Sequence, residues 1–174
     1  MLMEAGSLHS LHSLNLDFVQ LNSDAMLGLT QAPSITSLQK LALSSSSQEL
    51  DCFEHLQQAN FRDSLRVLDL SNADLTNEHF RVLEEGEAFA RIHSLSLNHN
   101  LFDDEGLSLL GQAAVFPALK TLSLWGCTVS VEGLLHLIAQ PSFADVLVFL
   151  NKDGFSEREY EELKQKGGNQ IRCA

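Results

Sequence analysis

A period of 27 residues runs through most of the chain and constrains its fold more than any other feature. Equivalent segments begin at Leu11, Leu38, Leu65, Ile92 and Leu119, with no gap between them. Within each segment the leucines first alternate, as in a half-buried strand, and then recur at the spacing of one helix face. The period therefore predicts a stack of strand–helix units, each burying its apolar side against its neighbours.

The strand half of each segment has leucine or isoleucine at its first, fourth and sixth residues. The fourth and sixth residues form inward pairs on one strand face: Leu14 and Leu16, Leu41 and Leu43, Leu68 and Leu70, Leu95 and Leu97, and Leu122 and Leu124. Residues between them are expected to point to the opposite face of the sheet, because side chains alternate along a strand. Most of these outward residues are small or polar, and Trp125 is the exception.

The helix half carries an apolar pair three residues apart. These pairs are Met26 and Leu29, Phe53 and Leu56, Phe80 and Leu83, Leu107 and Leu110, and Leu134 and Leu137. A carboxylate recurs in the predicted first turn, where it favours the helix dipole, at Asp24, Asp51, Glu78, Glu105 and Glu132. Thr76, Asp103 and Ser130 are predicted N-caps. A further apolar ring, Ile35, Phe61, Phe89, Phe116 and Phe143, is expected to close each helix toward the next strand.

The repeat changes at both ends of the chain. Residues 1–10 fit the later half of a repeat, so we expect either a partial first repeat of a longer array or a short cap. Five 27-residue repeats are assigned to residues 11–144. After Phe143 the count slips by one, and Val148 and Leu150 become the inward pair of a sixth strand. Residues 145–174 are expected to form this irregular repeat and a charged cap, with a helix starting after Ser156 and a short strand at Ile171.

The pattern LxxLxLxx(N/C)x(L/V), followed by a helix, resembles the leucine-rich repeats, and its period resembles their ribonuclease-inhibitor-like class. The segments LDLSNADLTNEHF and LSLNHNLFDDEGL match most closely, and the resemblance covers about residues 8–152. The ninth position, usually Asn or Cys in the family, is Val19, Ser46, Ala73, Asn100 and Cys127 here, so a side-chain ladder there is incomplete. The resemblance implies an α/β solenoid: a right-handed βα superhelix with a parallel sheet on the concave face and helices on the convex face.

Composition limits the partners that such a solenoid would bind. A net charge of -12 argues against nucleic acid and membrane surfaces, which need clustered Lys and Arg, and leaves a basic protein partner possible. The chain has no apolar run long enough to cross a bilayer and no secretory signal, so a cytoplasmic location is expected. Three cysteines without metal-ligand spacing predict reduced thiols, and no cofactor or metal is expected.

The resemblance implies a non-catalytic protein-interaction module, and the outward residues of the strands supply its candidate site. The candidate partner-binding residues are Trp125, Phe149, Leu147, His99, Asn98, Asp69 and Asp17. An aromatic cluster around Trp125 has the composition of a binding hot spot. Two other interpretations stay open: the tail from Gly167 covers this cluster, or Phe149 belongs to the core.

Other functions remain as alternatives. Members of this class also regulate GTPases or act as recognition subunits of ubiquitin ligases, and the chain could be a fragment of a pathogen effector. Asp69, Ser96 and His99 come from neighbouring strands and could meet as a hydrolase triad, but the sequence has no nucleophile elbow or oxyanion hole, so no enzyme activity is expected. Self-association through an open N-terminal end is a further possibility.

Overall fold

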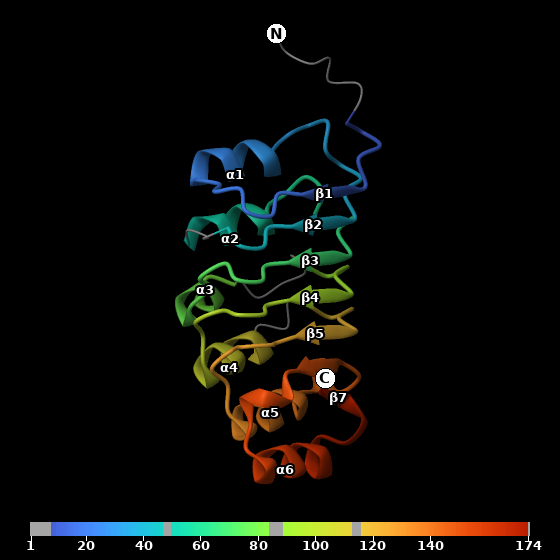
Figure 1. The fold of residues 1–174 in the computed structure, drawn as a ribbon. Coiled ribbons are helices and arrows are strands. Elements are labelled where there is room, and N and C mark those ends of the chain that lie inside the picture. The colour runs from blue at the N-terminus through green and yellow to red at the C-terminus, as the bar shows by residue number, and fades with distance from the viewer. Residues whose placement is uncertain (1–7, 47–49, 84–88, 113–115, 174) are drawn as a thin grey trace.

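A parallel sheet of seven strands forms one side of the molecule, and the helices stand on the other side (Figure 1). The computed structural model describes residues 8–46, 50–83, 89–112 and 116–173. The strands are β1 (Ser13–Asn15), β2 (Lys40–Ala42), β3 (Val67–Asp69), β4 (Ser94–Ser96), β5 (Thr121–Ser123), β6 (Leu147–Leu150) and β7 (Ile171–Cys173). The helices are α1 (Ser23–Thr30), α2 (Leu50–Gln57), α3 (Asn77–Arg81), α4 (Asp104–Gln112), α5 (Val131–Ile138) and α6 (Glu157–Gly167). Short 3-10 helices are η1 (Pro141–Phe143), η2 (Lys152–Gly154) and η3 (Gly168–Gln170).

Strand order follows chain order, and the strands pair in a regular register. Leu14 pairs with Leu41, and the same offset of 27 residues brings Leu68, Leu95 and Leu122 into line. Leu122 then pairs with Val148, an offset of 26, so the count slips by one between β5 and β6. The α/β solenoid predicted from the period is confirmed. A parallel sheet with a helix after each of its first six strands also fits the leucine-rich-repeat fold that the sequence resembles.

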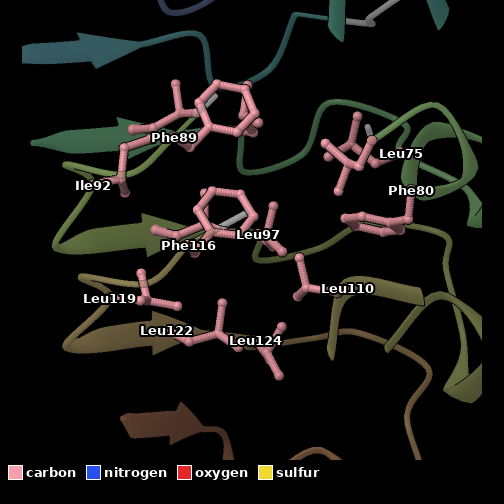
Figure 2. Close-up of a cluster of buried hydrophobic side chains, with 14 of the residues drawn as sticks. Leu75, Phe80, Phe89, Ile92, Leu97, Leu110, Phe116, Leu119, Leu122 and Leu124 are labelled. Atoms are coloured by element: carbon pink, nitrogen blue, oxygen red, sulfur yellow. The ribbon is translucent and has the colours of Figure 1, made fainter. Parts of the chain in front are cut away.

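One continuous apolar core lies between the sheet and the helices (Figure 2). The inward leucines of β2 to β5 are buried, as are the helix residues that face them. Phe89 and Phe116 stack with ring centroids 5.2 Å apart, and Phe80 meets Phe102 edge-on at 4.9 Å. Burial of a large apolar side chain contributes about 1.5–3 kcal/mol, so the stacking of units supplies the main stabilisation of the fold.

Side chains at the ninth repeat position hold successive turns together. Asn100 is buried, and its Oδ1 accepts hydrogen bonds from the backbone N–H of Ala73 and of Leu75, both at 3.0 Å. Its Nδ2 donates to Leu70 O and Leu97 O. These bonds satisfy backbone groups that would otherwise be buried without partners. The ladder that the sequence indicated as incomplete therefore has its fullest connection at Asn100.

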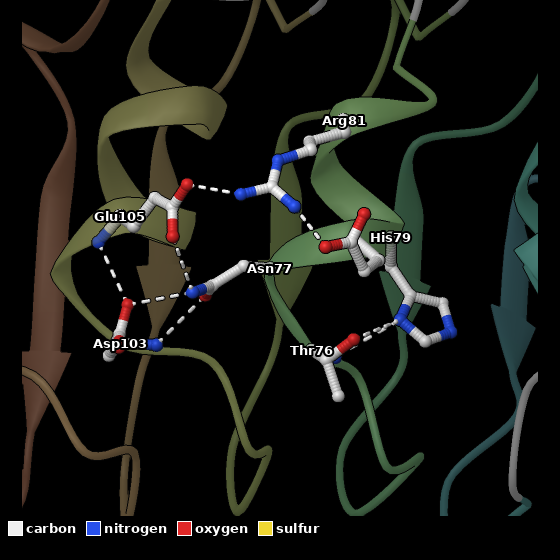
Figure 3. A network of polar contacts seen from close by, with 7 residues as sticks. Thr76, Asn77, His79, Arg81, Asp103 and Glu105 are labelled. Carbon is white, nitrogen blue, oxygen red and sulfur yellow. Dashed lines mark hydrogen bonds and ion pairs between the residues drawn. The ribbon is translucent and has the colours of Figure 1, made fainter.

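The helix N-termini are capped largely as predicted. Ser130 Oγ accepts from Gly133 N at 3.1 Å, and Asp103 Oδ1 accepts from Glu105 N at 2.9 Å. Thr76 is the N-cap of α3, where its backbone N–H donates to His79 Nδ1 at 3.0 Å (Figure 3). The histidine takes the place that glutamate or glutamine holds in an ordinary capping box.

A polar network joins α3 to the start of α4 (Figure 3). Asn77 Nδ2 donates to Asp103 Oδ1 at 2.9 Å and to Glu105 Oε2 at 3.2 Å. The Arg81 guanidinium contacts the carboxylates of both Glu78 and Glu105. All these groups lie on the surface, so the network contributes little net stability, but it neutralises part of the carboxylate row at the helix starts.

The C-terminal end of the stack is closed by residues 155–173. β7 adds to the edge of β6, with Val148 beside Ile171, and α6 buries Leu163 against the core. Ser156 and Glu159 form the predicted capping box of α6. Gly167 is the last helical residue, and Gly168 after it has a positive φ of 54°, a backbone conformation that favours glycine.

The N-terminal end is different, because the inward leucines of β1 are only half-buried. The expected partial first repeat falls mainly on residues 1–7, which lie outside the described residues. Within the described ranges, no helix has both the length and the apolar character needed to cross a bilayer.

Candidate functional site

The helix-free face of the sheet carries the outward residues of the strands, and its character changes along the stack. From β1 to β5 these residues are mainly serine, asparagine, aspartate and threonine. After β5 and along β6 they become apolar: Trp125 follows β5, and Leu147 and Phe149 alternate with buried Val148 and Leu150 on β6. Trp125 is 37% exposed and the two β6 residues are half-buried. We call Trp125, Leu147 and Phe149 the apolar patch.

The described part of the C-terminal tail lies beside this patch and does not fold over it. Residues 171–173 continue the sheet as β7 beside β6, with Arg172 in register with Phe149. The interpretation that Phe149 belongs to the core is wrong, because its neighbours Val148 and Leu150 are the buried pair. Arg172 was missed as a possible site residue, although the predicted strand at Ile171 placed it on this face.

Asn98 fixes the backbone beneath Trp125. Its Oδ1 accepts from the backbone N–H of Trp125 at 2.8 Å and from Ser123 Oγ at 2.7 Å. Its Nδ2 donates to Ser96 Oγ at 3.0 Å. A side chain that holds three groups of two strands makes the start of the turn after β5 rigid, which lowers the entropy lost when a ligand binds there.

His99 lies next to this turn in an unusual backbone conformation. Its φ is 54°, and its backbone N–H donates to Trp125 O at 2.6 Å. The eighth residue of each repeat shares this left-handed conformation: Phe18, Ser45, Asn72, His99 and Gly126. At Gly126, where φ is 66°, an added Cβ would stand 2.3 Å from His99 Nδ1. Glycine is thus required there twice, once for the backbone and once to admit the histidine ring.

Asp69, Ser96 and His99 do not form a hydrolase triad. Asp69 Oδ1 accepts from Ser71 Oγ at 2.6 Å, and Ser71 Oγ lies 2.8 Å from Ser96 Oγ. Ser96 in turn contacts Asn98, while the His99 ring lies over Gly126. A triad needs the histidine between the serine and the carboxylate. Asp69 and Ser96 instead belong to a polar chain that runs through Ser71, Asn98 and Ser123, and the His99 ring lies apart from it.

Asp17 is placed apart from the other candidate residues, beside β1. Its Oδ1 accepts from the backbone N–H of Ser44 at 2.8 Å, and its Oδ2 accepts from Asn15 Nδ2 at 2.9 Å. Burial raises the pKa of Asp17, but the hydrogen bonds from Ser44 and Asn15 outweigh it and hold the pKa below its ordinary value. Asp17 accepts from the backbone N–H of Ser44 just as Asn98 accepts from that of Trp125. This contact between neighbouring repeats is structural.

The structure brings together reactive side chains at two further places that the sequence did not predict. Ser23 Oγ contacts a carboxylate oxygen of Asp51 and lies 3.1 Å from His55 Nε2, so the hydroxyl bridges α1 to α2. Cys127 Sγ donates to Leu97 O at 3.1 Å, and burial raises the pKa of this thiol, which keeps it protonated and weakly nucleophilic. In the part of the chain that the structure describes, no group of three His, Cys, Asp or Glu side chains could hold a metal ion.

Comparison with known proteins gives a likeness of fold only. No protein-family model and no curated protein matches the sequence. Among solved structures, the chain is similar to one described as "Crystal structure of TLR13-ssRNA13 complex", with 18% identity and a TM-score of 0.45. The match covers 80% of this chain and 22% of the other, so the chain spans about a fifth of the length of that protein.

Proposed function

We propose that this chain is a non-catalytic protein-interaction module that binds its partner with the apolar patch of Trp125, Leu147 and Phe149. We also propose that it is a leucine-rich-repeat domain of the ribonuclease-inhibitor-like class, with five repeats over residues 11–144 and an irregular repeat and cap over 145–174. Three cysteines without a disulfide are consistent with a reducing compartment such as the cytoplasm. A protein partner, rather than nucleic acid, remains our prediction.

The exposure of Trp125 among apolar neighbours carries this proposal. Tryptophan is the residue type most enriched in binding hot spots, and such residues gain most when a partner excludes water from them. Leu147 and Phe149 extend the apolar area on the next strand, and Arg172 adds a positive charge at its border. An apolar centre with a polar rim is the usual anatomy of a protein interface. A partner that presents apolar side chains beside a carboxylate would complement this surface.

Asn98 and His99 support the patch from the side of β4. Asn98 holds the backbone of Trp125, and the His99 ring covers Gly126. We assign Asn98 as a positioning residue, because its polar atoms are already bonded to Ser96, Ser123 and Trp125. His99 is exposed and can contact a partner directly.

Quantitative affinity capture from a native extract tests the proposal, with wild-type protein beside Trp125→Ala and Leu101→Ala. Leu101 is 66% exposed but lies outside the patch, so its variant is the matched control. Some proteins should be captured by both the wild type and the control. We expect the captured amount of these proteins to be at least about tenfold lower with Trp125→Ala. Equal capture by all three proteins would contradict the proposal. Loss of folding in Trp125→Ala, seen by circular dichroism, would assign Trp125 a structural role instead.

The hydrolase alternative predicts esterase turnover that depends on Ser96. The polar chain through Ser71, Ser96 and Asn98 gives no reason to expect it. Assay of the purified protein with activated esters, beside Ser96→Ala, separates the two functions, because only a catalytic Ser96 makes turnover vanish in the variant.

A further inference from the structure

The first repeat exposes residues whose counterparts in the next three repeats are buried against the preceding unit. Leu14 and Leu16 are half-buried, whereas Leu41 and Leu43 are at most 1% exposed. Val19 is 42% exposed, whereas Ser46, Ala73 and Asn100 at the same repeat position are buried. Ala25 on α1 is exposed, whereas Cys52 and His79 at its position are buried. We call Leu14, Leu16, Val19, Ala25 and Leu29 the N-terminal face.

These positions face the preceding unit throughout the stack. A Cβ on Gly106, which is equivalent to Ala25, would meet Asn77 Oδ1 and the Phe80 ring of the unit before it. Ser46 Oγ donates to Val19 O, and Asn100 binds Ala73 and Leu75 one unit earlier. The N-terminal face is therefore a cross-section of the apolar core, already shaped to receive a unit of the same kind.

The first repeat, which carries this face, has far fewer charged residues than the C-terminal end of the molecule. Residues 8–37 contain two charged side chains, Asp17 and Asp24, in 30 residues. Residues 153–174 contain nine in 22, namely Asp153, Glu157, Arg158, Glu159, Glu161, Glu162, Lys164, Lys166 and Arg172. Depletion of charge is typical of the centre of a protein interface. Head-to-tail stacking would press the charged cap onto the apolar N-terminal face, so the face is complementary to itself rather than to the C-terminal end.

We infer that two copies of the chain associate through their N-terminal faces, related by a two-fold axis. In this arrangement β1 of one copy lies antiparallel to β1 of the other. β1 bonds to β2 on one side through His12 O and Leu16 N, and it is the first strand of the described sheet. A shared edge would join two seven-stranded sheets into one and pair strand edges that have no partner strand in the described sheet.

The size of the face sets the expected strength of the dimer. Extended residues 11–17 span roughly 23 Å, and one helix layer on one strand layer is roughly 20 Å deep, so the flat cross-section is on the order of 500 Å². That lies below the ~800 Å² per partner of a standard interface. A weak, concentration-dependent dimer is therefore expected, with a Kd on the order of 10 µM or above.

Sedimentation velocity over a concentration series, up to the millimolar range, tests the inference with the full chain. Wild-type protein should pass from monomer to dimer, and Ala25→Glu should shift the midpoint at least tenfold upward, because it places a carboxylate in the face. Leu27→Glu on the same helix is the control. Leu27 is equivalent to Arg81, which reaches Glu105 of the following helix, so it lies away from the face.

Val19→Glu is a second variant, which keeps the inference testable if Ala25→Glu does not fold. A wild type that stays monomeric throughout would overturn the inference and would indicate that residues 1–7 or another partner covers the face. A dimer that withstands both Ala25→Glu and Val19→Glu would overturn it as well. If Trp125→Ala weakened the dimer and these two variants did not, the contact between copies would lie at the apolar patch. That result would also overturn the inference.

Discussion

The first repeat and the middle repeats use the same leucine positions with different results. Leu122 on β5 is fully buried between units on both sides, whereas Leu14 on β1 is half-buried, with one neighbouring unit among the described residues. The C-terminal end has no such deficit, because β7 pairs with β6 and α6 packs against α5. Burial of the inward leucines in this fold thus depends on the neighbouring unit. At an end of the stack, a cap must take the place of that unit to shield the apolar core from water.

The largest expected effect contrasts Leu122→Ala with Leu14→Ala. Leu122→Ala removes a fully buried side chain and leaves a cavity, which should lower the free energy of unfolding by about 4 kcal/mol. Leu14→Ala removes a side chain that is partly in solvent and should cost about 1 kcal/mol. Urea unfolding of both variants measures the difference. Equal losses would show that Leu14 is covered as fully as Leu122.

A second contrast concerns the ninth repeat position. Asn100→Ala leaves the buried N–H groups of Ala73 and Leu75 without their acceptor, so the free energy of unfolding should fall by about 3 kcal/mol. Val19→Ala, at the same position in the open first repeat, should change it by less than about 0.5 kcal/mol. Thermal unfolding of the two variants checks this, and a small effect of Asn100→Ala would mean that water replaces the side chain.

The smallest expected effect concerns the cap that closes the C-terminal end. Ser156→Ala should destabilise the protein by about 1 kcal/mol at neutral pH, through loss of the capping box of α6. Hydrogen bonds from the Ser156 side chain and backbone lower the pKa of Glu159 below its ordinary value of 4.5. This stabilisation is therefore present above about pH 4.5 and is lost as the pH falls through the lower folded-state pKa. The difference between the two proteins should shrink in acid to the part that the pH-independent bond from Glu159 N to Ser156 Oγ supplies. A difference that does not change with pH would exclude the Glu159 carboxylate from the effect.

The sequence predicted the features that depend on local period. The inward leucines, the slip after Phe143, the N-caps Thr76, Asp103 and Ser130, and the outward direction of Leu147 and Phe149 all agree with the structure. Each follows from side-chain alternation along a strand or from the residue types at a helix end. Both signals can be read within one repeat of the sequence. The candidate residues around Trp125 were found because a large aromatic residue interrupts a row of small polar ones.

Features that arise between repeats were not predicted. The left-handed residue at Phe18 or His99 has no common side-chain type across the repeats, so the sequence carries no signal for it. His79 caps α3 in a position where the pattern calls for glutamate or glutamine. The contact of Ser23 with Asp51 and His55 joins residues 28 and 32 positions apart and depends on how α1 packs on α2. These contacts follow from strand register and helix packing rather than from any one segment.

Hydrogen–deuterium exchange, measured by mass spectrometry at low and high protein concentration, tests the difference between the two ends most directly. At low concentration, amides in residues 11–30 should exchange faster than those in β3 to β7, because the inward leucines of the first repeat are only half-buried. Raising the concentration should slow exchange in residues 11–30 and leave β3 to β7 unchanged. Protection of β1 equal to that of β4 at low concentration, or exchange that does not depend on concentration, would contradict an open first repeat that a second copy covers.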